Sequence, residues 1–382
     1  MLHQIKDLFY FTIYSLFYRF SGAHNKPTSD SKYDPTIEHK NRLWYKIVRW
    51  YENREFLNRF GYQARQVNQP LITVPLPEIS NPQGFNRHFF QYMTQGKTKP
   101  IVMRGLIKEC SAVKKWNPDF FINNYGETEL LTLGKTKNQK SDAYTSFTQR
   151  AECRYIKIKD SIENMRNNNQ KLYINNVTEI FMKHPELVND LNIDIIKNID
   201  QSVNSQSWLK MNLFLGGPGT GSSLHCAVAG NFFFNIYGKK KWILIDSKYA
   251  KYFKMTPSKH FGFVISGYDL EDLEQIQTFN GLIPMYEVIL EPGDCLFVPP
   301  WVLHYVKNET DFTIGVAVRD HTVYWQSWKN NWIFMLMSPY WWKLHPLFLK
   351  FANWFKGRDH LVNISMQSDK HILHHLAGES AS

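Results

Sequence analysis

The sequence predicts a mainly β protein, a jelly-roll barrel (double-stranded β-helix) with flanking helices at its N- and C-terminal ends. Short segments rich in β-branched or aromatic residues recur along the middle of the chain, and Gly, Pro, Asn or Asp bound most of them. Aromatic residues make up 15% of the 382 residues, which is enough for a large core. The expected strands are 71–74, 100–103, 208–215, 232–236, 241–245, 286–290, 294–298 and 312–318.

Three further segments carry local signals. The stretch 116–126 predicts a helix, because Asn117 can cap it, Pro118 suits its first turn and Gly126 can end it. The glycine-rich run 216–221 lacks the Gly-Lys-Ser/Thr ending of a phosphate-binding loop and leads into a strand, so we expect a hairpin turn. In the same way 292–294 is typical of a turn that closes a hairpin, which favours Asp294 as a turn residue over a metal ligand.

Composition divides the chain into four regions: 1–33, 34–80, 81–320 and 321–382. The first holds an apolar segment, 8–18, that is shorter than the ~20 residues of a membrane span. We expect an amphipathic helix there, followed by a linker, and leave a secretory signal open. A helical region and then the barrel follow. The aromatic-rich C-terminal extension, broken by Pro339 and Pro346, favours a cap on the barrel or a homodimer interface over a membrane surface.

Charge and cysteine usage bear on partners and compartment. Lys and Arg number 45 against 34 Asp and Glu, so the chain favours anionic partners such as an acidic carrier protein or lipid head groups. Nucleic acid is disfavoured, because the sequence has no compact basic motif. The four cysteines form no C-x-x-C pair, which suits a reducing compartment. We expect a cytoplasmic protein and leave peripheral membrane contact open.

Two histidines stand in segments typical of an iron site. His225 lies within Ser222–Trp242, and His304 ends Pro299–His304. Sites with two histidines and one carboxylate hold Fe(II), and the carboxylate often stands two residues after the first histidine. Ala227 occupies that position here. In an alternating strand Cys226 faces away from His225, so we do not propose it as a ligand.

Four segments in order resemble the cupin-like JmjC oxygenases, the branch that includes the asparaginyl hydroxylase of hypoxia-inducible factor. They are Lys99–Leu106, Lys115–Phe121, Ser222–Trp242 and Glu291–His304, and the resemblance extends over 82–320. It implies a JmjC-like barrel and the use of Fe(II), 2-oxoglutarate and O2.

The resemblance also implies roles for individual residues. His225 and His304 resemble the metal ligands, and Lys240 stands where the family places the lysine that pairs with the distal carboxylate of 2-oxoglutarate. Cosubstrate contacts are implied for Asn231, Ser222 and Tyr173. Ala317 stands where the hydroxylase has an asparagine. Arg319 shares its strand parity, and we expect it at the barrel mouth, contacting an anion or substrate carboxylate; the alternative is a rim residue paired with Asp320.

Ala227 leaves three outcomes open. Halogenases that depend on Fe(II) and 2-oxoglutarate have Ala or Gly at this spacing, which leaves room for chloride on the iron. This similarity predicts a halogenase that chlorinates an unactivated C–H bond of a small-molecule or carrier-tethered substrate through a ferryl-chloride. The second outcome is a hydroxylase with water or another ligand in place of the carboxylate, and the third is an inactive cupin-like scaffold. We favour the halogenase, because Ala227 has the right size to leave room for chloride. The presence of the other residues implied by the resemblance argues against an inactive scaffold.

Overall fold

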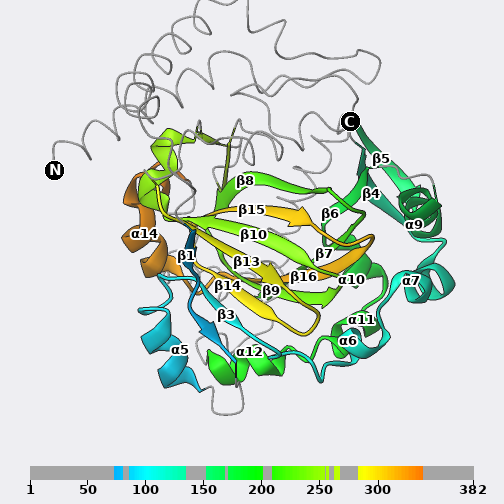
Figure 1. Ribbon diagram of the computed structural model, residues 1–382, viewed down its shortest axis with the longest axis horizontal. Helices are drawn as coiled ribbons and strands as arrows, with labels where there is room; N and C mark the ends of the chain where they lie inside the picture. The colour runs from blue at the N-terminus through cyan, green and yellow to red at the C-terminus, as the bar shows by residue number, and fades with distance from the viewer. Residues whose placement is uncertain are drawn as a thin grey trace, which may run out of the picture.

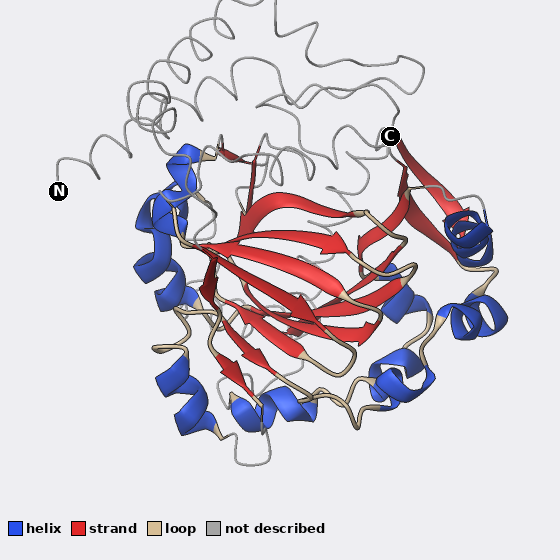
Figure 2. Ribbon diagram, in the orientation of Figure 1, coloured by secondary structure: helices blue, strands red, loops and turns tan. Residues whose placement is uncertain are grey.

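Two β-sheets form the body of the structure, a computed structural model (Figures 1 and 2). It describes residues 73–80, 86–134, 152–167, 171–200, 209–253, 255–257, 262–266 and 283–338. The seven-stranded sheet has the order β1 (Thr73–Pro75), β13 (Met285–Leu290), β10 (Lys240–Ile245), β15 (Leu303–Asn308), β8 (Gly221–Ala227), β12 (Phe263–Ser266) and β11 (Met255–Pro257). The nine-stranded sheet has the order β2 (Glu78–Ile79), β3 (Ile101–Met103), β14 (Cys295–Val298), β9 (Gly230–Tyr237), β16 (Thr313–Asp320), β7 (Leu209–Gly216), β6 (Leu172–Val177), β4 (Glu129–Gly134) and β5 (Glu152–Lys157).

The connections between strands make this pair of sheets a jelly roll, which confirms the predicted fold class. Within the barrel the chain passes from one sheet to the other at β7–β8, β8–β9, β9–β10, β13–β14, β14–β15 and β15–β16. The two hairpins expected at 216–221 and 292–294 are therefore wrong, because each segment joins strands of different sheets. Glycine permits a sharp turn in either case, as at Gly219 and Gly293, whose φ values are +66° and +96°. Turn composition thus predicts the turn and leaves the pairing of the next strand open.

Helices cover the outer faces of the two sheets (Figure 2). They are α5 (Arg87–Met93), α6 (Ser111–Lys115), α7 (Pro118–Tyr125), α9 (Ile158–Asn167), α10 (Glu179–Lys183), α11 (Glu186–Asp190), α12 (Asp194–Ile199), the 3₁₀ helix η4 (Ser247–Tyr252) and α14 (Tyr324–Met337). Helix α7 confirms the expectation for 116–126: the Asn117 side chain accepts a hydrogen bond from the Phe120 amide at 2.8 Å, and the helix ends before Gly126.

Three apolar clusters hold these layers together. One lies between the nine-stranded sheet and the helices from α5 to α12, and a second between the seven-stranded sheet, η4 and α14. The third fills the barrel between the sheets and includes Phe233, Trp242, Leu244 and Val302. The barrel interior is therefore a packed apolar core with a small number of polar side chains embedded in it. Burial of this apolar surface is the main driving force for folding.

Parts of the expected organisation lie outside the described residues. These are the N-terminal segment 1–33, most of the region 34–80 and the C-terminal extension beyond Ser338. Among the described helices, none is long and apolar enough to cross a membrane. Cys110, Cys226 and Cys295 are buried free thiols. Cys226 packs in the cluster outside the seven-stranded sheet, which confirms that it faces away from His225.

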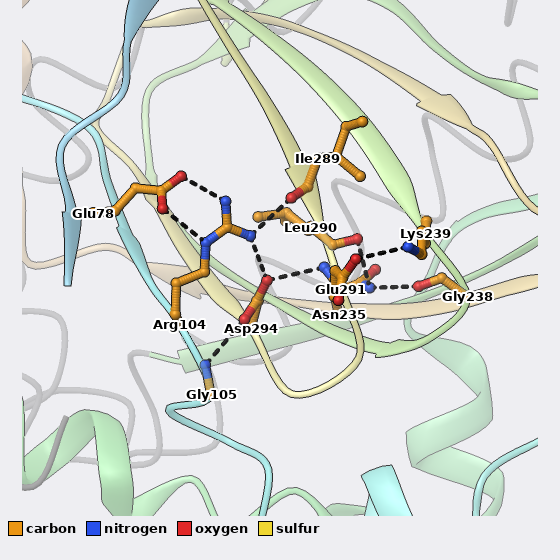
Figure 3. A network of polar contacts seen from close by, with 10 residues as sticks. All are labelled: Glu78, Arg104, Gly105, Asn235, Gly238, Lys239, Ile289, Leu290, Glu291 and Asp294. Atoms are coloured by element: carbon orange, nitrogen blue, oxygen red, sulfur yellow. Dashed lines mark hydrogen bonds and ion pairs between the residues drawn. The ribbon is translucent and has the colours of Figure 1, made fainter. Parts of the chain in front are cut away.

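Asp294 organises the link between β13 and β14 (Figure 3). Its carboxylate accepts hydrogen bonds from the backbone amides of Gly105 at 3.0 Å and Glu291 at 2.9 Å, and pairs with Arg104 at 2.6 Å. Arg104 also donates to the Ile289 carbonyl and pairs with Glu78. The position of Asp294 in this network confirms that it is a turn residue.

Replacing Arg104 by alanine is expected to destabilise the protein by about 2 kcal/mol. Breaking a buried ion pair costs ~3–5 kcal/mol, and partial exposure of Arg104 reduces that figure. Urea unfolding measures the free energy. The control is Lys114→Ala, which breaks an exposed pair with Glu109 and should cost less than ~1 kcal/mol. Equal losses in the two variants would contradict a specific role for the Asp294 network.

Candidate metal and cosubstrate site

His225 and His304 lie side by side on neighbouring strands. They are directly opposed in the antiparallel pairing of β8 with β15, and their ring centroids are 4.1 Å apart. His304 is only 4% exposed, and His225 is half-buried. The structure therefore brings together two residues that are 79 positions apart in the chain, as the resemblance implies.

A β-bulge in β8 sets the direction of the site side chains. Ser222 opposes Val306 and His225 opposes His304, so three steps along β8 match two steps along β15. Such an extra residue re-aims the side chains on the bulged strand. Without the bulge, Ser222 and His225 would face opposite sides of the sheet, because their separation is odd.

Both histidines are held in the neutral form that suits a metal ligand. The Nδ1 of His225 lies 2.7 Å from the Ser223 carbonyl, and the Nδ1 of His304 lies 2.9 Å from the Val302 carbonyl. A carbonyl accepts only from N–H, which places the proton on Nδ1 and the lone pair on Nε2. Burial lowers the pKa of His225 to about 4 and the pKa of His304 well below its usual value. Two of the three protein ligands of an iron centre thus fit this site.

The third ligand position has no replacement from the described part of the chain. Ala227 is buried, and its carbonyl accepts a hydrogen bond from the Trp301 amide at 2.7 Å. Among the described residues, no group of three or more His, Cys, Asp or Glu side chains could hold a metal ion. A metal at these two histidines would therefore need ligands from solution.

Arg319 brings a buried positive charge to the same site. Its positive charge helps to lower the pKa of both histidines, and burial lowers its own pKa to about 10. It donates to the Asn176 side-chain oxygen at 3.0 Å. Asn176 lies in a bulge of β6 and has a φ of +62°, a left-handed conformation that ordinary residues rarely adopt. Asp320 faces the opposite side of β16 and pairs with Lys97, which contradicts the alternative of Arg319 as a rim residue paired with Asp320.

Lys240 lies deeper in the barrel as a second buried cation. Its ammonium donates to Asn308 Oδ1 at 2.6 Å and Thr313 Oγ1 at 2.8 Å, both neutral oxygens. It forms no ion pair with any described carboxylate, and its side chain is fully buried. Burial lowers its pKa to about 7. A dicarboxylate bound in the barrel would supply the missing negative charge, so Lys240 fits the cosubstrate that the resemblance implies.

The other expected cosubstrate residues surround the same interior. Tyr173 and Ser222 hydrogen-bond to each other, and the Tyr173 ring lies 5.9 Å from the Lys240 ammonium. Burial raises the pKa of the Tyr173 phenol, which stays protonated. Asn231 pairs with Arg319 across the strands, and its side-chain oxygen is buried without a hydrogen-bond partner among the described residues. Trp242 stacks on His304, and its Nε1–H is also buried without a hydrogen-bond partner among the described residues.

Sequence reasoning missed several polar residues of this site. Asn308 and Thr313 hold Lys240, and Thr220 accepts from Asn308 at 2.9 Å. The signal for Asn308 was available, because it lies on the strand of His304 at an even spacing of four and so faces the same side. Asn176 gave no such signal, since only the bulge brings it to Arg319.

Gly315 provides the space that Lys240 occupies. An added methyl at Gly315 would overlap the Phe233 ring and lie 3.3 Å from Cε of Lys240. We expect Gly315→Ala to weaken 2-oxoglutarate binding about 10-fold and to cost ~1–3 kcal/mol of stability, because overpacking shifts both side chains. Calorimetric titration and urea unfolding measure the two effects. The control is Gly217→Ala, whose methyl makes ordinary contact with Met165 at 3.5 Å; a similar loss there would contradict the prediction.

Comparison with known proteins agrees with this architecture. The profile of the cupin-like domain matches residues 86–328. JmjC domain-containing protein D of Dictyostelium discoideum is 26% identical over 251 residues, which cover 61% of this chain and 54% of that protein. JmjC domain-containing protein A of the same organism is 24% identical, over 65% of this chain and 97% of the relative. Mouse tRNA wybutosine-synthesizing protein 5 is 24% identical, over 64% and 77%.

The chain thus spans about half the length of JmjC protein D and most of the length of the other two relatives. Proteins of the cupin and JmjC type are typically oxygenases that depend on Fe(II) and 2-oxoglutarate. The matched region contains both histidines, Lys240 and Arg319, and covers more than half of the chain. The protein therefore belongs to the cupin-like domain family.

Proposed function

We propose that this protein is an Fe(II)- and 2-oxoglutarate-dependent halogenase that acts on an unactivated C–H bond. The observation that carries the proposal is the combination of two neutral histidines, an alanine at the position of the third acidic ligand, and a buried arginine whose charge acts on both histidines. His225 and His304 would hold the iron. When bound, the iron supplies O2 activation coupled to oxidative decarboxylation of 2-oxoglutarate.

Electrostatics at Ala227 favour an anion from solution. A dication held by two neutral imidazoles lacks the charge that a carboxylate would provide, and the methyl group donates nothing. Arg319 adds a further positive charge within reach of both histidines. A small anion beside Ala227 would be attracted to both cations, and a halide has the single charge and small size for that position. Asn176, strained in the left-handed region, keeps Arg319 in place for this contact.

The stoichiometry follows from the cosubstrates. The C–H bond of the substrate is replaced by C–Cl, and one O2, one 2-oxoglutarate, one chloride and one proton are consumed. Succinate, CO2 and water are the other products. Lys240 would bind the distal carboxylate of 2-oxoglutarate, and the protonated Tyr173 phenol would donate to it. The apolar walls of the barrel, including Phe233 and Phe214, would exclude water from the reacting carbon.

An inactive binding scaffold is the second candidate, and Arg319 is also the observation that favours it. The same positive charge opposes binding of a dication when no anion accompanies it. The two candidates therefore differ in whether chloride restores metal affinity. A hydroxylase with water at the third position is distinguished by indifference to chloride.

The test is an anaerobic titration of the protein with Fe(II) and 2-oxoglutarate, followed by the visible charge-transfer band, with chloride or with acetate as the only anion. A halogenase is expected to show a band that sharpens and forms at lower Fe(II) with chloride. His304→Ala is the control and should show no band. A band of equal strength in both salts would favour the hydroxylase, and absence of any band would favour the scaffold; either outcome overturns the proposal.

Arg319→Gln separates the contribution of charge from that of space. The amide keeps much of the side-chain volume and removes the positive charge near His225 and His304. We expect the concentration of chloride needed for half of its effect on the band to rise about 10-fold, with the band in saturating chloride retained. An unchanged chloride requirement would remove Arg319 from the proposed anion site.

A further inference from the structure

A cavity lies beside the barrel, between η4, α14 and the segment that leads from α5 into β3. Its volume is about 420 Å³, within the ~300–1,000 Å³ typical of small-molecule sites. Figure 1 shows α14 at the end of the barrel where β15 begins, the end nearest His304. The cavity is separate from the polar cluster around Lys240, which lies at the opposite end of β10.

Positive charge dominates the rim of this cavity. Lys99, Lys248 and Lys329 line it, and Asp246 is the only acidic residue among the described residues that line it. Lys99 pairs with Asp246 at 3.1 Å, whereas Lys248 and Lys329 are exposed and take part in no ion pair with a described carboxylate. The ammonium of Lys248 lies 4.9 Å from the centroid of the Tyr249 ring. An anionic group at the rim would therefore meet two lysines that have no acidic partner in the described structure.

The inner wall of the cavity is apolar and continues into the barrel. Trp332, Ile333, Tyr286 and Val302 line it. Val302 and Tyr286 also pack in the cluster that fills the barrel interior. The carbonyl of Val302 accepts the Nδ1–H of His304 at 2.9 Å. Val302, one of the residues that form this wall, is thus hydrogen-bonded to the candidate metal ligand His304.

Hydrogen bonds fix the wall in place at a break in α14. Asn331 has φ −154° and ψ 87°, which interrupts the helix, and its side chain caps the Phe334 amide at 3.0 Å. Asn330 donates to the Pro300 carbonyl at 2.8 Å, and its own carbonyl accepts from Ser247 at 2.6 Å. The break therefore shapes a cavity that is built into the fold and tied to the loop before His304.

We propose that this cavity binds the anionic head group of an amphipathic substrate, with the apolar part of the molecule lying along Trp332 and Val302 toward His304. A phosphate or carboxylate would meet Lys248 and Lys329. Binding of the ligand is inferred from the cavity alone. Its role as the substrate rests on the proposed function.

The test uses octyl phosphate as the probe, titrated calorimetrically into iron-free protein. We expect measurable binding, and at least about 10-fold weaker binding to the double variant Lys248→Ala/Lys329→Ala, because two charge-assisted contacts are lost. The matched control is Lys114→Ala/Lys157→Ala, which removes two lysines that lie outside the cavity and pair with Glu109 and Glu127. The control should bind the probe like the unmodified protein.

Two further probes examine the chemistry of the ligand. Octanol lacks the charge, and inorganic phosphate lacks the apolar chain; both should bind at least about 10-fold more weakly than octyl phosphate. Equal binding of octanol, equal binding of inorganic phosphate, or no effect of the double variant would each overturn the site. The octyl phosphate titration contains no iron, so it tests the cavity independently of the proposed function. If octyl phosphate binds as expected but chloride has no effect on the Fe(II) band, the proposed function is overturned and the cavity remains a binding site.

Discussion

Replacing Ala227 by aspartate is expected to convert the centre from one completed by chloride to one completed by its own carboxylate. The new side chain stands two residues after His225 on the same face of β8, the spacing that places a carboxylate on the metal. We expect Fe(II) affinity to rise about 10- to 100-fold and the chloride dependence of the visible band to disappear. Any chlorinated product should be replaced by a hydroxylated one.

Arg319 gives the Ala227→Asp variant a second possible outcome, which a further variant can distinguish from metal coordination. The new carboxylate could pair with the buried guanidinium instead of a metal, which would raise stability without raising metal affinity. The variant Ala227→Asp/Arg319→Gln removes that partner and should bind Fe(II) at least as tightly as Ala227→Asp alone. Ala227→Asn is the matched neutral control and should not increase Fe(II) affinity. Unchanged chlorination in Ala227→Asp would contradict the open ligand position.

The jelly-roll class and the central strands could be predicted because they depend on local chemistry. Runs such as 232–236 and 241–245 are rich in apolar residues, and turn residues bound them, so β9 and β10 were predictable. The helix α7 was predictable because its cap, its first proline and its terminal glycine are consecutive signals. The two histidines came from the resemblance, which carries information that one sequence lacks.

The features that escaped prediction depend on contacts between distant segments. Strands β4, β5 and β6 extend the nine-stranded sheet with polar and mixed segments, whose strand state is fixed by pairing rather than by composition. The bulges in β8 and β6 are invisible to a pattern of period two, yet they place Ser222, His225 and Asn176 in one site. Turn residues likewise could not show that 216–221 joins two sheets.

Lys240 should make cosubstrate binding depend on pH. Burial lowers the pKa of its ammonium to about 7, so in the free protein the side chain loses its charge above neutral pH. A bound carboxylate favours the charged form and raises the pKa again, so binding takes up one proton above pH 7. The dissociation constant of 2-oxoglutarate should therefore rise about 10-fold per pH unit between pH 7 and 9. Lys240→Met should bind about 100-fold more weakly at pH 7 and lose this pH dependence.

The matched control is Lys241→Met, because Lys241 neighbours Lys240 in sequence and instead pairs with Glu287 at 3.3 Å. Anaerobic calorimetric titrations across this range measure the dissociation constants.

The stability of the protein gives an independent measurement, and the sign of its pH dependence is defined. The unfolded lysine keeps its proton up to its ordinary pKa of 10.5, so between pH 7 and 10 the unfolded state binds one more proton than the folded state. The free energy of unfolding of the ligand-free protein should gain from Lys240 as pH rises through that window, and Lys240→Met should lose this contribution. Equal pH profiles in Lys240→Met and Lys241→Met would mean that the buried ammonium does not titrate there.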